Sequence, residues 1–397
     1  MSENPLGDIT VIDLTQAVAG PCATSLLADF GADVVSIEPP GGGSEREYGG
    51  GSTMPNFGRN KRSLVLDLKT AEGTDVLHRL VEDADVLVHN NRPGKMADLG
   101  ADYETLAEIN PQLVYCSITG YGEEGPYRNR PGFDPLAQAM SGLMWVTGEP
   151  DRKPSRIGAS TIDIGTGIYA AFAIWPALRH VRQTGEGQKI EASLFDTAAV
   201  FMGHWYTQYD KTGEQPQRQG HSWELYAPSG IFETGTDPIY LSTPFQHLWE
   251  RVCHAVDRPD WIDDPRFETT EDRLKNRSEL IAALESEFHD YTRDELIDTL
   301  LEEGVPAAEL QTVAEAARDE HLQQRGTLTQ IEDVDGEEVT ATATPVVLSE
   351  TPGTIERGPP ALGEDSADIL LEYGFDDETI DTLLEQEVIR DGKRGGE

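Results

Sequence analysis

The carboxylate of Asp163 stands directly before the apolar stretch Gly165–Arg182, whose length and spacing predict one long helix. The helix dipole favours an ionised carboxylate at this end, and an ionised carboxylate can attack an activated acyl group to form a covalent intermediate. The same position suits a helix N-cap, with Thr166 or nearby amides as partners. The position alone favours the cap, although both roles can hold at once. Gly165 and Gly167 would let a reacting group approach the backbone closely.

Motifs for other kinds of chemistry are absent from the sequence. Gly41–Gly43 does not form the GxGxxG fingerprint of dinucleotide-binding enzymes, and neither a P-loop nor an HExxH zinc motif occurs. The cysteines, Cys22, Cys116 and Cys253, are too few and too far apart for a disulfide framework or a CxxC zinc site. The start of the chain, Met1–Asp8, is polar and is not expected to be a targeting segment. We therefore expect no metal, no permanently bound cofactor and a cytoplasmic location.

Strands and helices alternate through the first half of the sequence. Strand-like runs are predicted at Ile9–Leu14, Asp33–Glu38, Ser63–Leu68, Asp85–His89, Leu113–Thr119 and Lys189–Phe195. Helices are predicted between them at Cys22–Phe30, Thr70–Glu82 and Tyr103–Glu108. This alternation predicts an α/β fold with a Rossmann-like parallel sheet. Ligands of such sheets bind beyond the carboxyl ends of the strands, which here are the loops Thr15–Gly20, Glu38–Gly43, His89–Gly94 and Thr119–Gly125.

The pattern changes in the second half of the chain. Residues 226–325 are mostly helical, and we interpret them as a smaller α+β domain that follows a large domain over residues 1–225. Amphipathic spacing predicts helices in this part at Gln246–Ala255, Arg273–Tyr291 and Arg293–Glu303. Residues 326–397 form a C-terminal part, in which Gly336–Leu348 alternates like a hairpin and two short helices follow.

The composition is strongly acidic. Asp and Glu outnumber Lys and Arg by 72 to 31, for a formal net charge of −41 at pH 7, and only eight of the basic residues are lysines. This excess indicates a surface adapted to molar salt, the alternative being an acidic enzyme from an ordinary environment. The overall field repels phosphates, so nucleic acid and anionic membranes are not expected as partners. No apolar run is expected to reach the length of a membrane span.

Read with their neighbours, the loops carry a chain of recognisable segments. These are, in order, "ITVIDLTQAVAGPCATSLLADFGADVVSIEPPGGG", "RNKRSLVLDLKTAEG", "NNRPGKMADLG", "SITGYGEEGPYRNRPGFDPLAQAMSGLM" and "STIDIGTGIYAAFAIWPALRHVRQTGEGQ". With the later segments "GVPAAEL" and "PPALGEDSADILLEYGF", the sequence resembles the class III CoA-transferase family over nearly its whole length. This family is also called the formyl-CoA transferase and carnitine CoA-transferase group.

The resemblance implies a covalent mechanism and a particular assembly. Asp163 falls where the family's nucleophilic aspartate lies, and its carboxylate would attack an acyl-CoA thioester to give a mixed anhydride and then an aspartyl-CoA thioester. Acyl-CoA and a carboxylic acid would be the substrates. The resemblance further implies an intertwined homodimer, a large domain to which the C-terminal part returns, and an active site between domains and subunits.

Several residues are implied to contact CoA. By position in the family motifs these are the amides of Val18 and Ala19 near the thioester, the groove residues Leu66, Asp67, Leu68, Lys69, Asn90, Asn91 and Arg92, and Thr119, Gly120 and Tyr121 over the pantetheine. Lys61, Arg62, Arg92 and Lys95 would supply positive charge for the phosphates. The alternative is that these basic side chains pair with surface acids.

Two rival functions use the same fold. Racemases of acyl-CoA place an aspartate where Asp163 lies, but they also need a histidine in a GHD segment that aligns with Gly132, Phe133 and Asp134. Phe133 cannot carry a proton, so racemisation by that pair is not expected. The second rival is a non-catalytic subunit of a heteromeric transferase, against which the aspartate and its flanking glycines argue.

The acids exchanged are suggested by departures from the formyl-CoA transferase pattern. Those enzymes carry a glutamine at the place of Val18, a lysine at the place of Thr119 and a tetraglycine loop, none of which occurs here, so oxalate and formate are not expected. The segments look most like members that use succinyl-CoA and a C4 or C5 dicarboxylate such as malate, mesaconate or itaconate. A distal carboxylate would need a basic clamp, for which the candidates are Arg46, Arg59, Arg128, Arg130 and His221.

Overall fold

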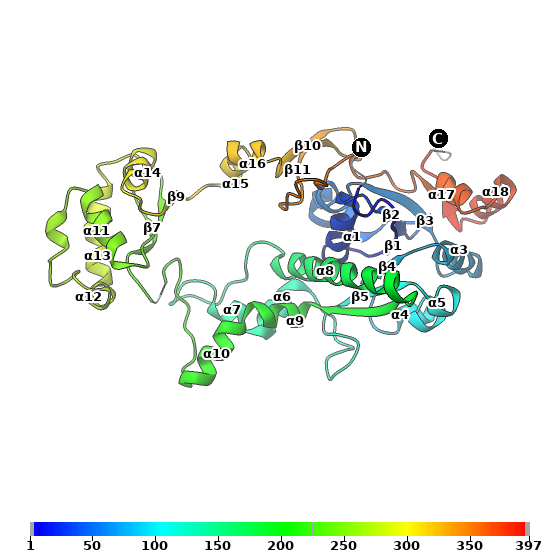
Figure 1. Ribbon diagram of the computed structural model, residues 1–397, viewed down its shortest axis with the longest axis horizontal. Coiled ribbons are helices and arrows are strands. Elements are labelled where there is room, and N and C mark those ends of the chain that lie inside the picture. Colours follow the sequence, from blue (N-terminus) through cyan, green and yellow to red (C-terminus); the bar gives the residue numbers. More distant parts are fainter. Residues whose placement is uncertain (1–3, 224, 394–397) are drawn as a thin grey trace. The chain divides into compact units, whose positions relative to one another are not determined.

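A seven-stranded sheet lies at the centre of the larger part of the molecule. The computed structural model describes residues 4–223 and 225–393, so the first three residues of the predicted polar start lie outside it. The strand order is β12-β3-β2-β1-β4-β5-β6, and Figure 1 labels β1 to β5 of this sheet. These strands are β1 (Thr10–Leu14), β2 (Asp33–Glu38), β3 (Lys61–Leu66), β4 (Val86–His89), β5 (Val114–Thr119), β6 (Gln188–Ser193) and β12 (Ile389–Arg390). All neighbouring pairs are parallel except β12 with β3, so the predicted α/β fold with a Rossmann-like parallel sheet is confirmed.

Strand β1 is the point at which the strand order reverses. The chain runs from β1 through β2 to β3 on one side and then returns to β4, which pairs with the free edge of β1. The loops after β1 and β4 therefore leave adjacent strands. This is the place where open α/β sheets bind their ligands.

Helices cover both faces of the sheet. They are α1 (Ala19–Asp29), α3 (Ala71–Glu82), α5 (Tyr103–Ile109), α6 (Asp134–Ser141), α8 (Thr161–Thr184), α9 (Leu194–Phe201), α17 (Ser366–Glu372) and α18 (Asp377–Glu385). Helix α10 (Gly203–Thr212) follows α9 and crosses from the larger unit of the chain into the smaller one. Helices α1 and α8 share one core with residues such as Leu27 and Ile174. Helices α3, α5, α17 and α18 pack on the other face, with Leu77 and Ile369 in their core. Short turns are α2 (Met54–Phe57), α4 (Lys95–Asp98), α7 (Leu143–Val146), α15 (Val313–Ala316), α16 (Glu320–Gln324), η1 (Ser44–Arg46), η2 (Tyr48–Gly51) and η3 (Pro259–Trp261).

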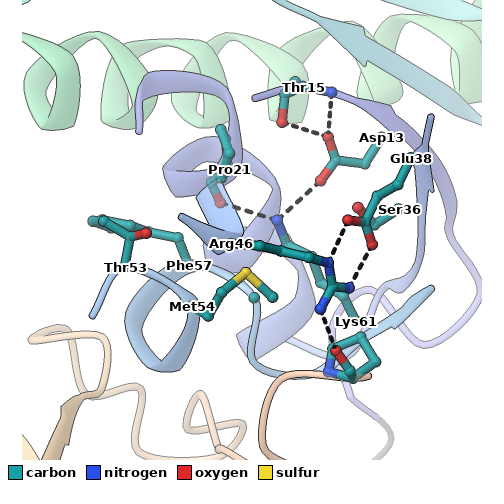
Figure 2. Close-up of a pocket in the computed structure, with 12 residues that line it drawn as sticks. Asp13, Thr15, Pro21, Ser36, Glu38, Arg46, Thr53, Met54, Phe57 and Lys61 are labelled. Atoms are coloured by element: carbon teal, nitrogen blue, oxygen red, sulfur yellow. Dashed lines mark hydrogen bonds and ion pairs between the residues drawn. The ribbon is translucent and has the colours of Figure 1, made fainter. Parts of the chain in front are cut away.

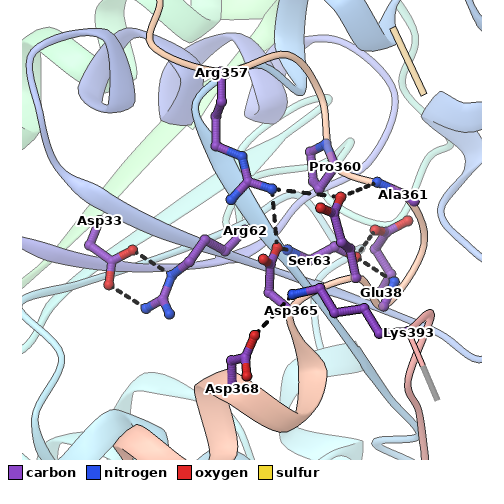
Figure 3. Close-up of polar contacts among 12 residues, drawn as sticks. Asp33, Glu38, Arg62, Ser63, Arg357, Pro360, Ala361, Asp365, Asp368 and Lys393 are labelled. Atoms are coloured by element: carbon purple, nitrogen blue, oxygen red, sulfur yellow. Dashed lines mark hydrogen bonds and ion pairs between the residues drawn. The ribbon is translucent and has the colours of Figure 1, made fainter. Parts of the chain in front are cut away.

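The C-terminal residues return to the edge of the sheet, where β12 pairs with β3. Figure 3 shows the polar contacts that hold them: the Asp365 carboxylate accepts from the Ser63 N–H at 2.9 Å, and the Ser63 hydroxyl donates to Glu38 at 2.8 Å. Arg62 on β3 also pairs with Glu372 on α17 at 2.7 Å. The larger unit is thus built from both ends of the chain.

The chain forms two compact units. The larger contains the residues up to Leu143, Ile157–Thr207 and the residues from Glu320, and the smaller contains Met144–Arg156 and Gln208–Asp319. These boundaries differ from those expected from the sequence, which placed the residues before 226 in the large domain and 320–325 in the small one.

Hydrogen bonds of Arg218 explain part of this difference. Its guanidinium donates to the carbonyl oxygens of Trp145, at 3.2 Å, and Glu149, at 3.1 Å. These bonds join the segment 144–156 to the segment after 208. Their partners lie about 70 residues apart, so no local pattern reports them.

The smaller unit combines a three-stranded antiparallel sheet with helices. Its elements are β7 (Ser229–Phe232), β8 (Ile239–Ser242), β9 (Ala307–Glu309), α11 (Gln246–Ala255), α12 (Thr270–Lys275), α13 (Arg277–Phe288) and α14 (Arg293–Glu302). The prediction of a single helix over Arg273–Tyr291 is wrong, because the helix is interrupted at Asn276, between α12 and α13. The Asn276 side chain donates to Arg266 O and Asp272 O, both at 3.0 Å, and so competes with helical backbone bonds.

The C-terminal hairpin lies earlier than predicted. It pairs β10 (Leu328–Glu332) with β11 (Glu338–Thr342), and the turn contains Gly336. Gly336 has φ +80, a left-handed conformation that glycine adopts without strain. Gly336, predicted to begin the hairpin, therefore lies in its turn.

Helix α8 meets the length and composition of a membrane span, contrary to the expectation from the sequence. Its mean hydropathy over an 18-residue window is 1.2, and it is the one such helix in the described part of the chain. Core helices of soluble proteins pass the same test. Here α8 packs on α1 and the sheet through its buried residues, which include Ile162, Ala170 and Ile174.

Candidate active site

Helix α8 begins earlier than the sequence indicated, and this changes the position of Asp163. The first helical residue is Thr161, so Asp163 lies inside the first turn rather than before it. The carboxylate that caps this turn belongs to Asp134, whose Oδ2 accepts from the N–H groups of Ile162 at 2.8 Å and Asp163 at 3.2 Å. The alternative that Asp163 is itself the N-cap is therefore wrong.

Asp134 is in turn fixed by Gln138, one helical turn later on α6. Gln138 Nε2 donates to Asp134 Oδ1 at 2.5 Å, and Gln138 Oε1 accepts from the Ile157 N–H at 2.9 Å. Both side chains are buried. The pair holds the start of α8, while the Asp163 carboxylate oxygens have no hydrogen bond within residues 4–223 and 225–393 and stay available for chemistry.

The environment of Asp163 opposes its ionisation. Burial, and then the negative charge of Asp134, raise the pKa of Asp163 to about 7. The expectation of a fully ionised group at neutral pH is therefore wrong, because loss of hydration outweighs the helix dipole. A partly protonated, half-buried carboxylate is a common property of reactive acids.

The pH dependence of activity should report this raised pKa. Only the ionised carboxylate of Asp163 can attack an acyl group, so kcat/KM is expected to rise with pH up to a midpoint near 7 and then level off. Asp134→Asn removes the neighbouring negative charge and should move this midpoint to lower pH. Asp196→Asn, an exposed acid in the first turn of α9, is the matched control and should leave the midpoint in place. A midpoint unchanged in Asp134→Asn would contradict the electrostatic account.

The glycines after Asp163 serve the packing of helices. A Cβ at Gly167 would lie 2.6 Å from the Ala19 carbonyl oxygen, and one at Gly165 would lie 2.6 Å from the ring of Phe201. The prediction that they leave room for a reacting group is therefore wrong. Their consequence is that the start of α8 approaches the start of α1 closely, with Cys22 Sγ 3.9 Å from Ile164 O.

Val18 and Ala19 lie at the N-terminus of α1, beside this contact. Val18 is the N-cap residue and Ala19 the first helical residue, and both are buried. Asp13 holds the loop that precedes α1. Its Oδ1 accepts from the Thr15 N–H and its Oδ2 pairs with Lys61 Nζ, both at 2.9 Å (Figure 2). The loop and the turn of Asp163 therefore meet through the packing of α1 on α8.

Four of the basic side chains proposed from the sequence form ion pairs with acids of the same chain. Lys61 is buried against Asp13, and Arg62 pairs with Asp33 and Glu372. Arg46 makes two bonds of 2.6 Å to Glu38 (Figure 2), and Arg59 makes bonds of 3.0 and 2.6 Å to the buried Asp29. Each therefore already pairs with acids of the same chain: Asp13, Glu38 and Asp29 are buried, whereas Asp33 and Glu372, the partners of Arg62, are exposed. This favours the alternative of acid pairing over phosphate binding or an acid clamp.

The remaining candidates for an acid clamp belong to two different units of the chain. Arg128 and Arg130 belong to the exposed loop between β5 and α6, where the Arg130 guanidinium lies 4.1 Å from the centre of the Tyr127 ring. His221 belongs to the smaller unit and accepts a hydrogen bond from the Ile231 N–H at 2.9 Å.

The segment Leu66–Lys69 follows β3. The Leu66 side chain is buried and the Leu68 side chain packs on the core. The Asp67 N–H donates to Val388 O at 2.8 Å, its carboxylate accepts from the Lys69 N–H at 3.0 Å, and the Lys69 side chain is exposed. An open cleft beside it is lined by Asp67, Thr70 and C-terminal residues that include Arg390, which no motif had indicated.

The segment Asn90–Arg92 follows β4, next to the loop of β1. The Asn90 side chain is bonded to the backbone of Gln16, and Asn91 Nδ2 lies 3.5 Å from Met96 Sδ. Arg92 and the nearby Lys95 are exposed, and neither forms an ion pair among the described residues. They follow β4, the strand that pairs with β1 where the strand order reverses.

Thr119, Gly120 and Tyr121 end β5. The Thr119 hydroxyl accepts from the Gly122 N–H at 2.9 Å, which closes a turn. Gly120 approaches Gly132 so closely that a Cβ there would lie 2.5 Å from Gly132 Cα. The Tyr121 ring packs against Phe195, with centroids 5.9 Å apart. The turn therefore ties the loop before α6, and through it Asp134, to the sheet.

Comparison with known proteins identifies the family. The model described as CoA-transferase family III matches residues 6–366. The succinate–glutarate CoA-transferase of Agrobacterium fabrum is 35% identical, over 93% of this chain and 95% of that protein. The succinyl-CoA:mesaconate CoA-transferase of Haloarcula hispanica is 37% identical, over 93% and 96%. The succinyl-CoA–D-citramalate CoA-transferase of Chloroflexus aurantiacus is 34% identical, over 97% and 98%.

Solved structures agree with this assignment. A CAIB/BAIF family protein from Brucella suis superposes with a TM-score of 0.86 at 35% identity, covering 94% of this chain and all of that one. The fold, the family model and relatives of this similarity over nearly full length all point the same way. This chain belongs to CoA-transferase family III and is a CoA-transferase.

Proposed function

We propose that the enzyme transfers CoA from succinyl-CoA to a C4 or C5 dicarboxylate such as mesaconate, malate or itaconate. The observation that carries this proposal is the agreement among the relatives: several that match nearly the whole chain are named for succinyl-CoA or succinate and a dicarboxylate partner. The available carboxylate of Asp163 beside the first turn of α1 supports the chemistry.

The reaction proceeds by two exchanges on Asp163. The ionised carboxylate attacks the thioester carbonyl, the C–S bond breaks, and a mixed anhydride and CoA thiolate form. The thiolate then attacks the Asp163 carbonyl, which releases succinate and leaves an aspartyl-CoA thioester. The acceptor carboxylate repeats these steps in reverse order, so no net proton is consumed. The N–H groups of Val18 and Ala19 stabilise the negative oxygen that develops at each attack.

CoA lies along the carboxyl ends of the strands in this proposal. Leu66, Asp67, Leu68 and Lys69 line its groove at β3, Asn91 and Arg92 line it at β4, and Thr119, Gly120 and Tyr121 cover the pantetheine. The exposed Lys69, Arg92 and Lys95 attract the phosphates, since they form no ion pair within the described chain. In this proposal these three side chains take the place of the four basic residues that form ion pairs with acids of the same chain.

The functional state is proposed to be an intertwined homodimer. The larger unit exposes apolar side chains on α6, α8 and α9 and beside them, more than a soluble monomer usually leaves uncovered. They are Phe133, Leu136, Met140, Ile168, Tyr169, Phe172, Trp175, Val200 and Phe201. A mass of one chain in light scattering of the active enzyme would contradict the dimer.

The enzyme is further proposed to be cytoplasmic and adapted to high salt. A net charge of −41 repels itself, and salt screens this repulsion more fully as its concentration rises. The midpoint of thermal unfolding is therefore expected to increase from about 0.1 M to about 2 M KCl. A midpoint that falls over this range would contradict the halophilic interpretation.

A panel of acceptors tests the proposed substrates. Purified enzyme in molar KCl is given succinyl-CoA with one acid at a time, and the new thioester is identified by mass. Mesaconate, malate and itaconate should accept CoA, whereas acetate, butyrate, formate and oxalate should not. Acceptance by the monocarboxylates alone would overturn the dicarboxylate proposal. Activity only after addition of a second chain would favour a heteromeric enzyme, a state suggested by a 34% identical relative named as the beta subunit of a succinyl-CoA–L-malate CoA-transferase.

A further inference from the structure

The loop that joins β1 to α1 is held by side chains from the ends of two adjacent strands. Asp13, on β1, accepts from the Thr15 N–H at 2.9 Å. From the end of β4, Asn90 Oδ1 accepts from the Gln16 N–H at 2.9 Å, and Asn90 Nδ2 donates to Gln16 O at 2.6 Å. A single amide side chain thus fixes both backbone groups of Gln16.

The next residue, Ala17, has a strained backbone. Its φ of +64 lies in the left-handed region, which residues with a Cβ rarely enter. Such a conformation persists only where its surroundings determine it. The bonds from Asn90 act on the peptide groups directly before Ala17, and the close packing of Gly20 on Thr15, where a Cβ would be 2.3 Å away, closes the turn from the other side.

The conformation of Ala17 sets the direction of the two peptides that follow it. These carry the N–H groups of Val18 and Ala19, which enter α1 and form no hydrogen bond within the described residues. The same turn of α1 contacts the turn of Asp163 through Cys22 and Ile164. Asn90 is therefore linked to the turn of Asp163 through the Gln16 peptide, the Ala17 turn and the contact of α1 with α8.

We propose that Asn90 is a positioning residue for CoA transfer rather than a contact of CoA. It holds the Gln16 peptide, and through it the Ala17 turn, so that the Val18 and Ala19 N–H groups point at the negative oxygen formed when Asp163 attacks. This inference rests on the proposed function. An amide is required because one side chain must both accept and donate, which neither aspartate nor alanine can do here.

The test compares Asn90→Asp and Asn90→Ala with wild type in steady-state transfer from succinyl-CoA. Displaced oxyanion donors reduce turnover, so kcat should fall roughly 100-fold, while KM for succinyl-CoA changes less than about threefold. The matched control is Asn110→Ala, because the Asn110 side chain likewise bonds only to backbone. Its three partners are Val81 O, Ala84 O and the Gln112 N–H, at the opposite end of the sheet. Its kcat should stay within about twofold of wild type.

Two results would overturn the inference. A tenfold rise of KM with unchanged kcat in Asn90→Asp would mean a direct CoA contact, and a kcat no lower than that of Asn110→Ala would mean a structural role only. Asn90→Asp retains the acceptor for the Gln16 N–H, so it keeps the test open if Asn90→Ala does not fold. Failure of the proposed function is recognised separately, because the wild type would then transfer no CoA.

Discussion

Replacing Asp163 by asparagine is expected to lower kcat for CoA transfer by roughly 10⁴-fold or more, the scale seen when a covalent nucleophile is removed. The amide has the shape of the carboxylate and keeps the backbone bond to Asp134, but its oxygen cannot form the anhydride. The measurement is the rate of new acyl-CoA formation, followed by chromatography, with succinyl-CoA and the best acceptor of the panel.

Two further variants separate nucleophilicity from charge. Asp196→Asn removes an exposed acid from the first turn of α9 and should retain full activity. Asp163→Glu keeps the charge but moves the carboxylate by about one methylene, which should still cost about 100-fold in kcat. If Asp163→Asn kept more than about one hundredth of the activity, Asp163 would not be the nucleophile.

Replacing Arg273 by alanine is expected to lower the free energy of unfolding by about 3–5 kcal/mol. Arg273 is 1% exposed in the smaller unit, and all of its N–H donors are used. It donates to Ala227 O at 2.7 Å, to Phe267 O at 2.8 Å and to further neutral oxygens of Glu268, Gln246 and Thr270. Alanine would leave these buried acceptors without donors and open a cavity below Trp249.

This buried cation has no carboxylate partner among the described residues, and burial lowers its pKa to about 10. Arg273→Lys should therefore recover only part of the loss, since an ammonium cannot reach all of the acceptors. The control is Arg266→Ala, because Arg266 is exposed and its pairs with Asp264 and Glu279 are screened by solvent, so its loss should be much smaller than that of Arg273→Ala. Urea unfolding in molar KCl measures the free energy of unfolding of each variant. A decrease below about 1 kcal/mol for Arg273→Ala would contradict the account.

The parallel sheet could be predicted because its signal is local. Strands buried on both faces are continuous apolar runs, and the helices between them repeat every three to four residues. The predicted strand Asp33–Glu38 agrees with β2 to the residue, and Thr70–Glu82 contains α3. From this topology the loops beyond the carboxyl ends of the strands could be proposed as ligand-binding loops, whereas Asp163 was proposed from its helix and from the family resemblance.

The start of α8 could not be predicted, because its cap comes from another helix. Asp134 lies 28 residues before Ile162, whose N–H it accepts, and from the sequence it looks like an acid at the start of its own helix. The N–H groups of Ile162 and Asp163, which Asp134 accepts, have no partner nearby in the sequence. The local pattern therefore predicted a helix that begins at Gly165. Burial of Asp163, and then the negative charge of the same Asp134, raise the pKa of Asp163, which no local pattern could report.

The roles of the basic residues failed for a related reason. Composition shows that positive charge is scarce, but it does not show which acids each arginine or lysine faces. Lys61 meets Asp13 at a separation of 48 residues, and Arg59 meets Asp29 at a separation of 30. Both pairs are made inside the fold, where leaving a charge unpaired is costly. Arg92, on the loop after β4, and Lys95, at the start of α4, are exposed and form no ion pair among the described residues.

The central claim is that CoA becomes covalently attached to Asp163. The most direct measurement is the mass of the peptide containing Asp163, after brief incubation of the folded enzyme with succinyl-CoA in molar KCl and digestion at low pH. The account predicts a CoA adduct on this peptide that is absent from Asp163→Asn and disappears when an acceptor acid is added. Turnover without any such adduct, or an adduct that persists in Asp163→Asn, would contradict it.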